Sequence, residues 1–169
     1  TSFELYAEGV HVATGAYERG DRTLGVERGT SVDAALEWKG EGARVRAGVF
    51  ASRFGRFISL DDTGTTIDVP DDTGALETFD LYAFRAVKAR FTGFELEAEK
   101  RWALAGWRLG LLGHLDRTRA ANRETGEPLP RIAPLRGVLA AEVGSGPWDL
   151  RAEVEHARRQ TRVPASDSE

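Results

Sequence analysis

The chain has 169 residues, of which 30% are charged, with a formal net charge of −4 and no cysteine. The absence of cysteine excludes disulfides and thiolate metal sites, and the slightly acidic balance gives no support for a nucleic-acid partner. No apolar run approaches the roughly 18 residues of a membrane helix, so a membrane-spanning form of this chain would have to be built from strands.

Apolar and polar residues alternate with a period of two along about six segments, which predicts strands with one apolar and one polar face. In chain order the predicted strands are 31–39, 43–51, 79–102, 106–116, 136–143 and 148–156. The pattern becomes irregular over 52–60, where Gly55 predicts a β-bulge. No segment shows a convincing amphipathic helical pattern.

The predicted connections alternate between short and long. Short turns are expected at 40–42, 103–106 and 144–147, and long polar links at 61–78 and 117–134. A further polar segment precedes the first strand. Short turns at one end and long loops at the other are the layout of an outer-membrane barrel, which a soluble meander has no physical reason to follow.

All four tryptophans fall close to a short turn and in register with the apolar face of their strands. They are Trp38, Trp102, Trp107 and Trp148. Because tryptophan favours the interface between a membrane and water, this placement predicts an aromatic girdle. The alternative is a soluble β-sheet ligand-binding module, lipocalin-like or sandwich, whose tryptophans cap one end of a core. Such a module needs a second hydrophobic layer, which we do not find in the sequence.

The sequence therefore predicts an all-β, antiparallel, up-and-down transmembrane β-barrel segment. Its apolar face is expected to contact lipid, while charged residues such as Glu95, Glu97 and Glu99 line a wet interior. Glu37 is expected opposite Arg46 as an opposite-charge pair across a hairpin. About six strands cannot close a membrane barrel, because the smallest have eight, so the chain is expected to be part of a larger barrel.

Four segments resemble the barrel of TonB-dependent outer-membrane receptors. Residues 4–38 are similar to the family pattern E-L-[YF]-x-x-G-x-H-x-A-T-G-x-[FY]-E-x-G-[ND]-x-x-L-x-x-E that precedes a descending strand. Residues 89–97 resemble A-x-[FY]-x-G-x-E-x-E, and residues 129–143 resemble a segment beginning L-P-R-I-P-P-x-R, with Ala133 in place of a proline. Residues 156–169 resemble the strand end and loop before the last strands. The G-x-H-x-A-T-G form is most similar to the branch linked to zinc or haem uptake.

The resemblance implies a transporter rather than an enzyme, located in the bacterial outer membrane, with a barrel of about 22 strands. It implies that residues 1–169 are part of this barrel and include no plug domain. Residues 1–30 are expected to form an extracellular loop, 31–160 strands with short periplasmic turns and long extracellular loops, and 161–169 the start of a further loop.

The same resemblance implies several partners. They are the lipid bilayer, the remaining barrel strands, an N-terminal plug domain and, through the plug, the TonB complex. The implied cargo is a metal ion or a metal-bearing small molecule, such as zinc, haem or a siderophore. No cofactor is expected to be required, and Zn²⁺ enters only as a possible substrate.

The sequence offers no catalytic constellation, but it offers one candidate metal site. His11 lies near Glu8, Glu18 and Asp21 in the matched motif, and a histidine with carboxylates suits Zn²⁺. The alternative is that these polar residues only stabilise a folded loop. His114 is expected on the interior wall as a hydrogen-bonded residue.

Two further polar features have plainer interpretations. His156 is expected at the outer end of the last strand, on the lipid side. The segment 61–74 carries five aspartates, which could hold Ca²⁺. However, D-D-T-G is ordinary turn chemistry, and the turn is the favoured interpretation.

Overall fold

The structure is a computed structural model that describes residues 1–165, and nearly all of its regular structure is β-strand. Its elements in chain order are α1 (Ser2–Tyr6), β1 (Glu8–His11), β2 (Ala16–Arg19), β3 (Arg28–Gly40), β4 (Ala43–Pro70), β5 (Leu76–Leu104), β6 (Trp107–Asn122), β7 (Arg136–Ser145) and β8 (Trp148–Ala157). Among these residues no helix has the length and apolar character needed to cross a membrane. The predicted all-β class is confirmed.

The strands form one sheet in which each long strand pairs with its neighbour in sequence. The order is β3-β4-β5-β6-β7-β8, with antiparallel pairing throughout this series. The short hairpin β1-β2 joins separately, because β2 pairs in parallel with residues 81–83 of β5. Within the described residues β3 pairs only with β4, and β8 only with β7. The sheet is therefore an up-and-down segment with two open edges, as predicted.

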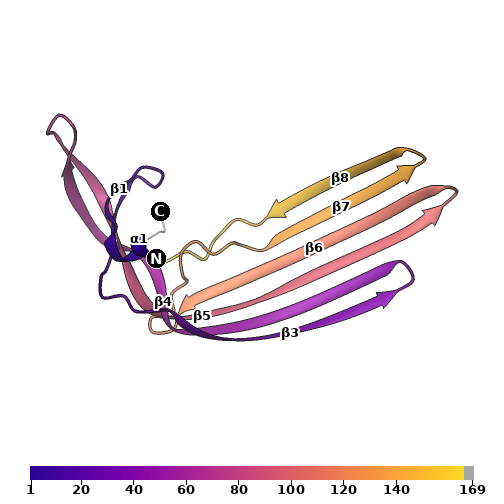
Figure 1. The fold of residues 1–169 in the computed structure, drawn as a ribbon, viewed down its shortest axis with the longest axis horizontal. Helices are drawn as coiled ribbons and strands as arrows, with labels where there is room; N and C mark the ends of the chain where they lie inside the picture. Colours follow the sequence, from indigo (N-terminus) through magenta and orange to yellow (C-terminus); the bar gives the residue numbers. More distant parts are fainter. Residues whose placement is uncertain (166–169) are drawn as a thin grey trace.

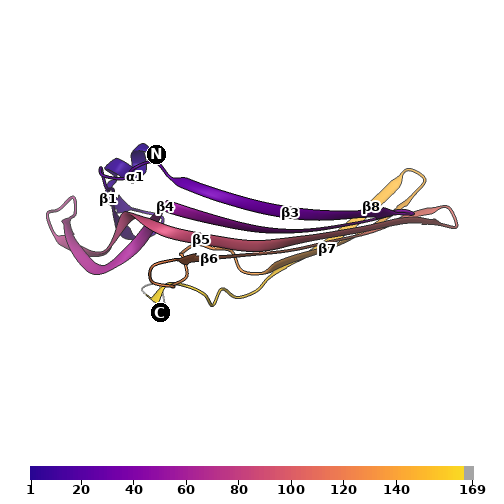
Figure 2. The same ribbon diagram turned by 90° about the horizontal axis from the view of Figure 1, so that it is seen from below.

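The long strands run side by side, and their short turns lie together at one end of the molecule (Figure 1). Turned by 90°, the same strands form one thin, curved layer (Figure 2). α1 and β1 lie at the opposite end, next to the outer parts of β4 and β5. We refer to these two ends of the sheet as the short-turn end and the long-loop end.

Two-residue turns close the three hairpins at the short-turn end. They are Glu41-Gly42, Ala105-Gly106 and Gly146-Pro147. Gly42, Gly106 and Gly146 have φ angles of 61°, 85° and 54°. Two-residue hairpin turns require such positive angles, and glycine adopts them without a steric penalty. The three predicted short turns are confirmed.

The long polar link expected over 61–78 is wrong, because the strand pair continues through most of it. β4 runs to Pro70 and β5 begins at Leu76, so only residues 71–75 form the connection. Half-buried Ile67 and Val69 alternate with exposed neighbours, which is a strand pattern. The second link is also shorter than expected, because β6 continues to Asn122.

Residues 1–30, expected to be a loop, contain α1, the β1-β2 hairpin and the start of β3. The close packing of α1 on the end of β2 depends on Gly20. A Cβ atom there would lie 2.7 Å from the backbone carbon of Leu5 and the backbone nitrogen of Tyr6. Together with the β2–β5 pairing, this contact gives the segment a fixed fold over the long-loop end.

One face of the sheet is an apolar surface that the described chain leaves exposed. This apolar face includes Val32, Leu36, Trp38, Val45, Val49, Leu96, Trp102, Leu111, Leu139, Leu150 and Val154. Leu36 is 77% exposed and Leu139 is 71% exposed. On β5 the row extends from Phe94 to Trp102, about nine residues, which is the length a tilted strand needs to cross a bilayer. Lys100 interrupts this row near the short-turn end, where its ammonium donates to the Glu41 carbonyl oxygen at 2.7 Å. An apolar surface of this extent marks a contact with another molecule or a membrane.

The opposite face changes character along its length. It carries charged residues near the short-turn end and an aromatic cluster, Phe54, Phe57 and Phe91, packed on buried Ala89 and Leu129 farther out. The three rings lie edge to face, with centroids 5.1–5.5 Å apart. The register shifts between Phe54 and Phe57, which confirms the bulge predicted at Gly55. The extra residue turns both rings onto the same face.

The tryptophans generate a prediction about the surroundings of the apolar face. All four lie on this face at the short-turn end, and Trp38 and Trp148 are 57% and 80% exposed. In the full-length protein in bilayers, we expect lipids labelled near the headgroup to quench their fluorescence more than lipids labelled at the chain ends. Equal quenching by both lipids, or efficient quenching by aqueous iodide alone, would contradict a membrane girdle.

The β4-β5 tip generates a second prediction. An Asp71 carboxylate oxygen accepts hydrogen bonds from the Thr73 hydroxyl and amide, both at 2.7 Å, and from the Ala75 amide at 2.9 Å. These bonds, first that from the Thr73 hydroxyl, lower the pKa of Asp71 below its ordinary 3.8. Because the folded pKa is the lower one, the stabilisation is present above the ordinary pKa and is lost as pH falls through the folded pKa.

We therefore expect Asp71→Ala to speed hydrogen exchange at the Thr73 and Ala75 amides in the full-length protein at neutral pH. In the wild type, the protection factors of these two amides, which account for the slower intrinsic exchange in acid, should fall as pH drops through the folded pKa of Asp71. Asp72→Ala is the matched control, because the neighbouring carboxylate is exposed and is not required by the turn. Equal exchange in both variants would remove Asp71 from its role at the tip.

Candidate functional site

The charged half of the second face is the main concentration of ionisable side chains in the described structure. We call it the charged face. It includes Glu37, Arg44, Glu99, Arg101, Arg108, His114, Asp116, Arg136, Glu142, Asp149, Arg151, Glu153 and Glu155. Strict alternation places these residues opposite the apolar side chains of the same strands.

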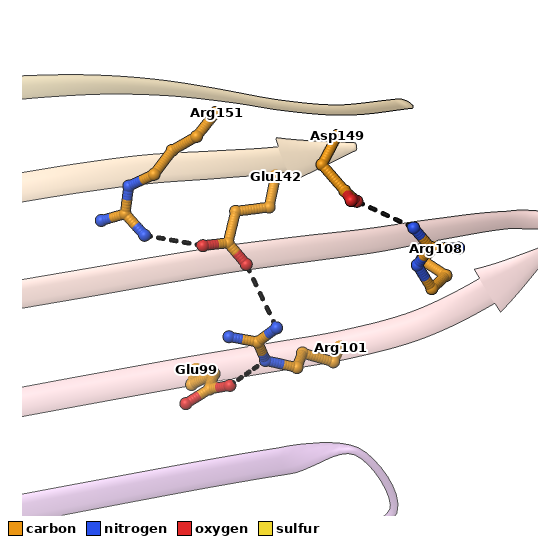
Figure 3. A network of polar contacts seen from close by, with 6 residues as sticks. All are labelled: Glu99, Arg101, Arg108, Glu142, Asp149 and Arg151. Carbon is orange, nitrogen blue, oxygen red and sulfur yellow. Dashed lines mark hydrogen bonds and ion pairs between the residues drawn. The ribbon is translucent and has the colours of Figure 1, made fainter. Parts of the chain in front are cut away.

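A continuous ion-pair network crosses the charged face near the short turns (Figure 3). Glu142 of β7 accepts from Arg151 of β8 at 2.6 Å and lies 3.2 Å from a terminal guanidinium nitrogen of Arg101 on β5. Arg101 also pairs with Glu99, and Arg151 with Glu153 at 2.5 Å. The network thus links three strands through the single carboxylate of Glu142.

Glycines on intervening strands create the space for these long-reaching pairs. Gly110 of β6 lies between Arg101 and Glu142 in the register, and a Cβ there would be 3.2 Å from a Glu142 carboxylate oxygen. Gly144 of β7 likewise lies under the 2.8 Å pair between Arg108 and Asp149. A Cβ on Gly144 would lie 2.2 Å from the Asp149 carboxylate, so a larger residue would block the pair.

A second network lies farther along the same face. Asp116 accepts from Arg136 at 3.0 Å and lies 2.9 Å from a ring nitrogen of His114, while Arg136 also approaches Glu155 at 3.6 Å. The expected placement of His114 as a hydrogen-bonded residue on this face is confirmed.

The expected cross-strand pair on the first hairpin is only half correct. Glu37 does lie opposite Arg46, but its carboxylate pairs with Arg44 and, at 3.4 Å, with Lys39. The strand register determines which backbone positions lie opposite each other, whereas long side chains can also reach residues on the diagonal.

The chemistry that this face can perform is electrostatic. Its arginines are 46–60% exposed, so each pair is screened by water and contributes little to stability. Carboxylates and guanidinium groups are already paired with each other. The face therefore forms a rigid, hydrated wall of fixed charges rather than a reactive centre.

The predicted metal site is assembled only in part. His11 and Glu18 lie on the same face of the β1-β2 hairpin, with a ring nitrogen of His11 3.8 Å from a Glu18 carboxylate oxygen. The same nitrogen is 3.1 Å from the Thr14 hydroxyl. Glu18 is 4% exposed, so its carboxylate is sheltered from water.

The other two predicted ligands lie elsewhere. Glu8 is opposite Arg19 in the register, so alternation places it on the hairpin face away from His11. Asp21 accepts hydrogen bonds from the Thr23 amide and hydroxyl at 2.8 and 2.6 Å, which commits it to a turn. Across residues 1–165 no three histidine or acidic side chains gather closely enough to hold a metal.

The aspartates of 61–74 show turn chemistry. Asp62 accepts from the Gly64 amide at 2.8 Å, and Asp71 holds the β4-β5 tip as described above. The turn interpretation therefore agrees with the structure at Asp71 and Asp72, whereas Asp61, Asp62 and Asp68 lie within β4, and Asp68 accepts across the strand pair from the Thr78 hydroxyl at 2.6 Å.

Two features of the charged face were missed from the sequence. The first is the aromatic cluster that follows the charged face toward the long-loop end, whose signal in the sequence was the two phenylalanines of F-G-R-F around the bulge. The second is the set of pairs between strands that are not neighbours. Gly110 of β6 and Gly144 of β7 could have indicated these pairs, but only once the register of the strands was known.

Comparison with known proteins agrees with this geometry. A family model described as "TonB dependent receptor-like, beta-barrel" matches residues 1–168. A solved structure named "Copper transporter OprC" is similar with a TM-score of 0.62 and 21% sequence identity. The match covers 83% of this chain and 19% of that chain, so this chain spans about a fifth of its length. At this identity the structural likeness shows a shared fold alone.

The Glu142 network generates a prediction that a double-mutant cycle can measure. In urea unfolding of the full-length protein, the effects of Glu142→Gln and Arg101→Gln on the free energy of unfolding should be non-additive, although the residues lie two strands apart. Glu142→Gln and Arg136→Gln should be additive, because Arg136 belongs to the other network. Additivity in both cycles would mean that the Arg101–Glu142 pair contributes nothing.

Proposed function

The chain belongs to the TonB-dependent receptor-like β-barrel family, and from this membership we propose that it forms part of the wall of an outer-membrane receptor that imports a metal. The cargo is a metal ion or a metal-bearing small molecule. Membership places the chain among receptors and transporters rather than enzymes. The soluble-module alternative is set aside, because the family match extends over nearly the whole chain.

The observation that carries the proposal is the division of a single-layer sheet into an exposed apolar face and an ion-paired face. In a barrel wall the first contacts lipid and the second lines the hydrated interior. The short turns then lie on the periplasmic side and the β4-β5 tip and β1-β2 hairpin on the extracellular side. In the bacterial outer membrane, two open edges would leave unpaired backbone groups in lipid, so further strands complete the wall.

The full receptor has partners that this chain would meet. A plug domain inside the barrel would contact the charged face, and the plug would in turn engage the TonB complex. The ion pairs fit this position, because paired charges present polar groups to a hydrated partner without leaving isolated charges when water is partly excluded.

The β1-β2 hairpin is the part of the chain that supports a metal as the cargo. His11 with sheltered Glu18 supplies two of the ligand types that zinc and copper accept, and the similar structure is named as a copper transporter. Two protein ligands make an incomplete metal site. Such a site suits a hairpin that binds the metal first and then releases it to further ligands. The zinc- or haem-linked branch is favoured by the G-x-H-x-A-T-G form at residues 9–15.

The hairpin generates a prediction with an internal control. In calorimetric titrations of Zn²⁺ and Cu²⁺ into the purified full-length receptor, His11→Ala and Glu18→Gln should each weaken binding of the cargo metal. Glu8→Gln should leave it unchanged, because Glu8 lies on the other face of the same hairpin. Affinity should also fall on acidification, because protons compete with metal for the imidazole.

Two outcomes would count against this assignment. Unchanged affinity in both His11→Ala and Glu18→Gln would leave the hairpin with a structural role only. An equal loss in Glu8→Gln would indicate a general effect of charge around the hairpin rather than ligation by His11.

A further inference from the structure

The β1-β2 hairpin lies beside the outer part of β5, and this contact adds a further acidic side chain to the hairpin face (Figure 1). β2 runs parallel to β5, and residues 17–19 pair with residues 81–83. Extended back by one position, this register places Ala16 beside Asp80. Because side chains alternate along each strand, Asp80 lies on the same face of the sheet as Ala16 and Glu18.

His11 completes a row across this face. It lies opposite Ala16 in the hairpin, so the row runs from His11 through Ala16 to Asp80 on three adjacent strands. Neighbouring strands are about 4.8 Å apart, which separates the backbones of His11 and Asp80 by about 10 Å. Ala16 places only a methyl group between them. The imidazole and the carboxylate can therefore reach one metal ion above Ala16, much as the Arg101–Glu142 pair spans an intervening strand.

The carboxylate of Asp80 is available for such a contact. Asp80 is exposed, and within residues 1–165 its side chain has no hydrogen bond or ion pair. Other aspartates of the β4-β5 hairpin are already bound, since Asp68 accepts from the Thr78 hydroxyl and Asp71 holds the tip. Asp80 thus combines an unused carboxylate with a position on the His11 face.

The three side chains together suit a metal better than the first two alone. One imidazole and two carboxylates are ligands that zinc accepts, and three protein ligands leave a fourth position open for exchange. In the structure they are not gathered closely enough to hold a metal. Because His11 and Asp80 are exposed, their side chains can rotate toward an ion while the strands stay in register. Glu18, 4% exposed, supplies the sheltered side of the site.

We propose that Asp80 is the third protein ligand of the metal site on the β1-β2 hairpin, so that a bound metal bridges β1, β2 and β5. The inference rests on the proposed function, which supplies His11 and Glu18 as the first two ligands. It assigns the metal a second effect, which is to fasten the hairpin to β5. Three residue pairs join β2 to β5 in the described chain, so a metal bridge adds substantially to this pairing.

The first measurement is a calorimetric titration of Zn²⁺ into the purified full-length receptor. Asp80→Asn keeps the size of the side chain and removes its charge, and we expect it to weaken Zn²⁺ binding by at least about tenfold. Residues that only support a metal ligand already change affinity by about 10–100-fold when they are substituted. Asp80→His should retain binding, because imidazole is itself a zinc ligand.

Glu77→Gln is the matched control. Glu77 is an exposed carboxylate on the same strand, but the odd number of residues between the two positions in the alternation places it on the opposite face from Asp80. This variant loses the same charge from the same hairpin and should leave the affinity for Zn²⁺ unchanged.

The second measurement is hydrogen exchange at the amides of residues 16–19, with and without saturating Zn²⁺. In the wild type Zn²⁺ should slow this exchange, because the metal joins β2 to β5 and opposes local opening. In Asp80→Asn at saturation the slowing should be smaller, because a metal held by His11 and Glu18 alone joins only the two strands of the hairpin.

Three results would overturn the assignment of Asp80. The first is an unchanged affinity in Asp80→Asn together with a loss in His11→Ala, which would leave the proposed function intact. The second is an equal loss in Asp80→Asn and Glu77→Gln, which would indicate general attraction by negative charge. The third is equal slowing of exchange at saturation in the wild type and Asp80→Asn. Unchanged affinity in His11→Ala and Glu18→Gln as well would instead contradict the hairpin metal site of the proposed function.

Discussion

The structure depends on one constraint: a single-layer sheet has two faces, and over the half near the short turns this chain covers neither. Each face has to be stable against its surroundings, and strand alternation allows the two to be specified independently. On the apolar face Leu36 and Leu139 remain exposed, whereas on the charged face Glu142 joins three strands by ion pairs. A barrel wall between lipid and water meets both requirements without a second layer.

The same alternation explains why polarity inverts along the strands. Near the short-turn end, apolar side chains point to one face and charges to the other. Beyond Leu115 the arrangement reverses, with Arg117 on the formerly apolar face and the Phe54–Phe91 cluster on the formerly charged one. The bulge at Gly55 makes this possible on β4, because one inserted residue keeps Phe54 and Phe57 on the same side. The reversal marks the height at which the sheet leaves the apolar layer.

Features set by local pattern could be predicted from the sequence, and features set by register could not. The six long strands, the three tight turns and the tryptophan placement follow from alternation and turn residues, which neighbouring positions determine. The continuation of β4 to Pro70 was missed because its polar composition resembles a loop. The pairing of Glu37 with Arg44 was missed although the register was predicted correctly, because the two side chains reach diagonally across the hairpin. Separating Glu8 from His11 required knowing that residues 8–11 form a strand. The Arg101–Glu142 pair passes over Gly110, so predicting it required the register of β5, β6 and β7 together.

The tight turns also determine how such a chain can fold. Each long strand pairs with the strand that precedes or follows it, so pairing can begin beside a tight turn, where the paired residues are close in sequence, and extend to pairs as distant as Ala43 and Lys100. The entropy lost in closing the first pairs beside a tight turn is small, and a completed hairpin offers its outer strand as a template for the next. Assembly can therefore advance one hairpin at a time, and within residues 1–165 only the outer edges of β3 and β8 stay open to further pairing.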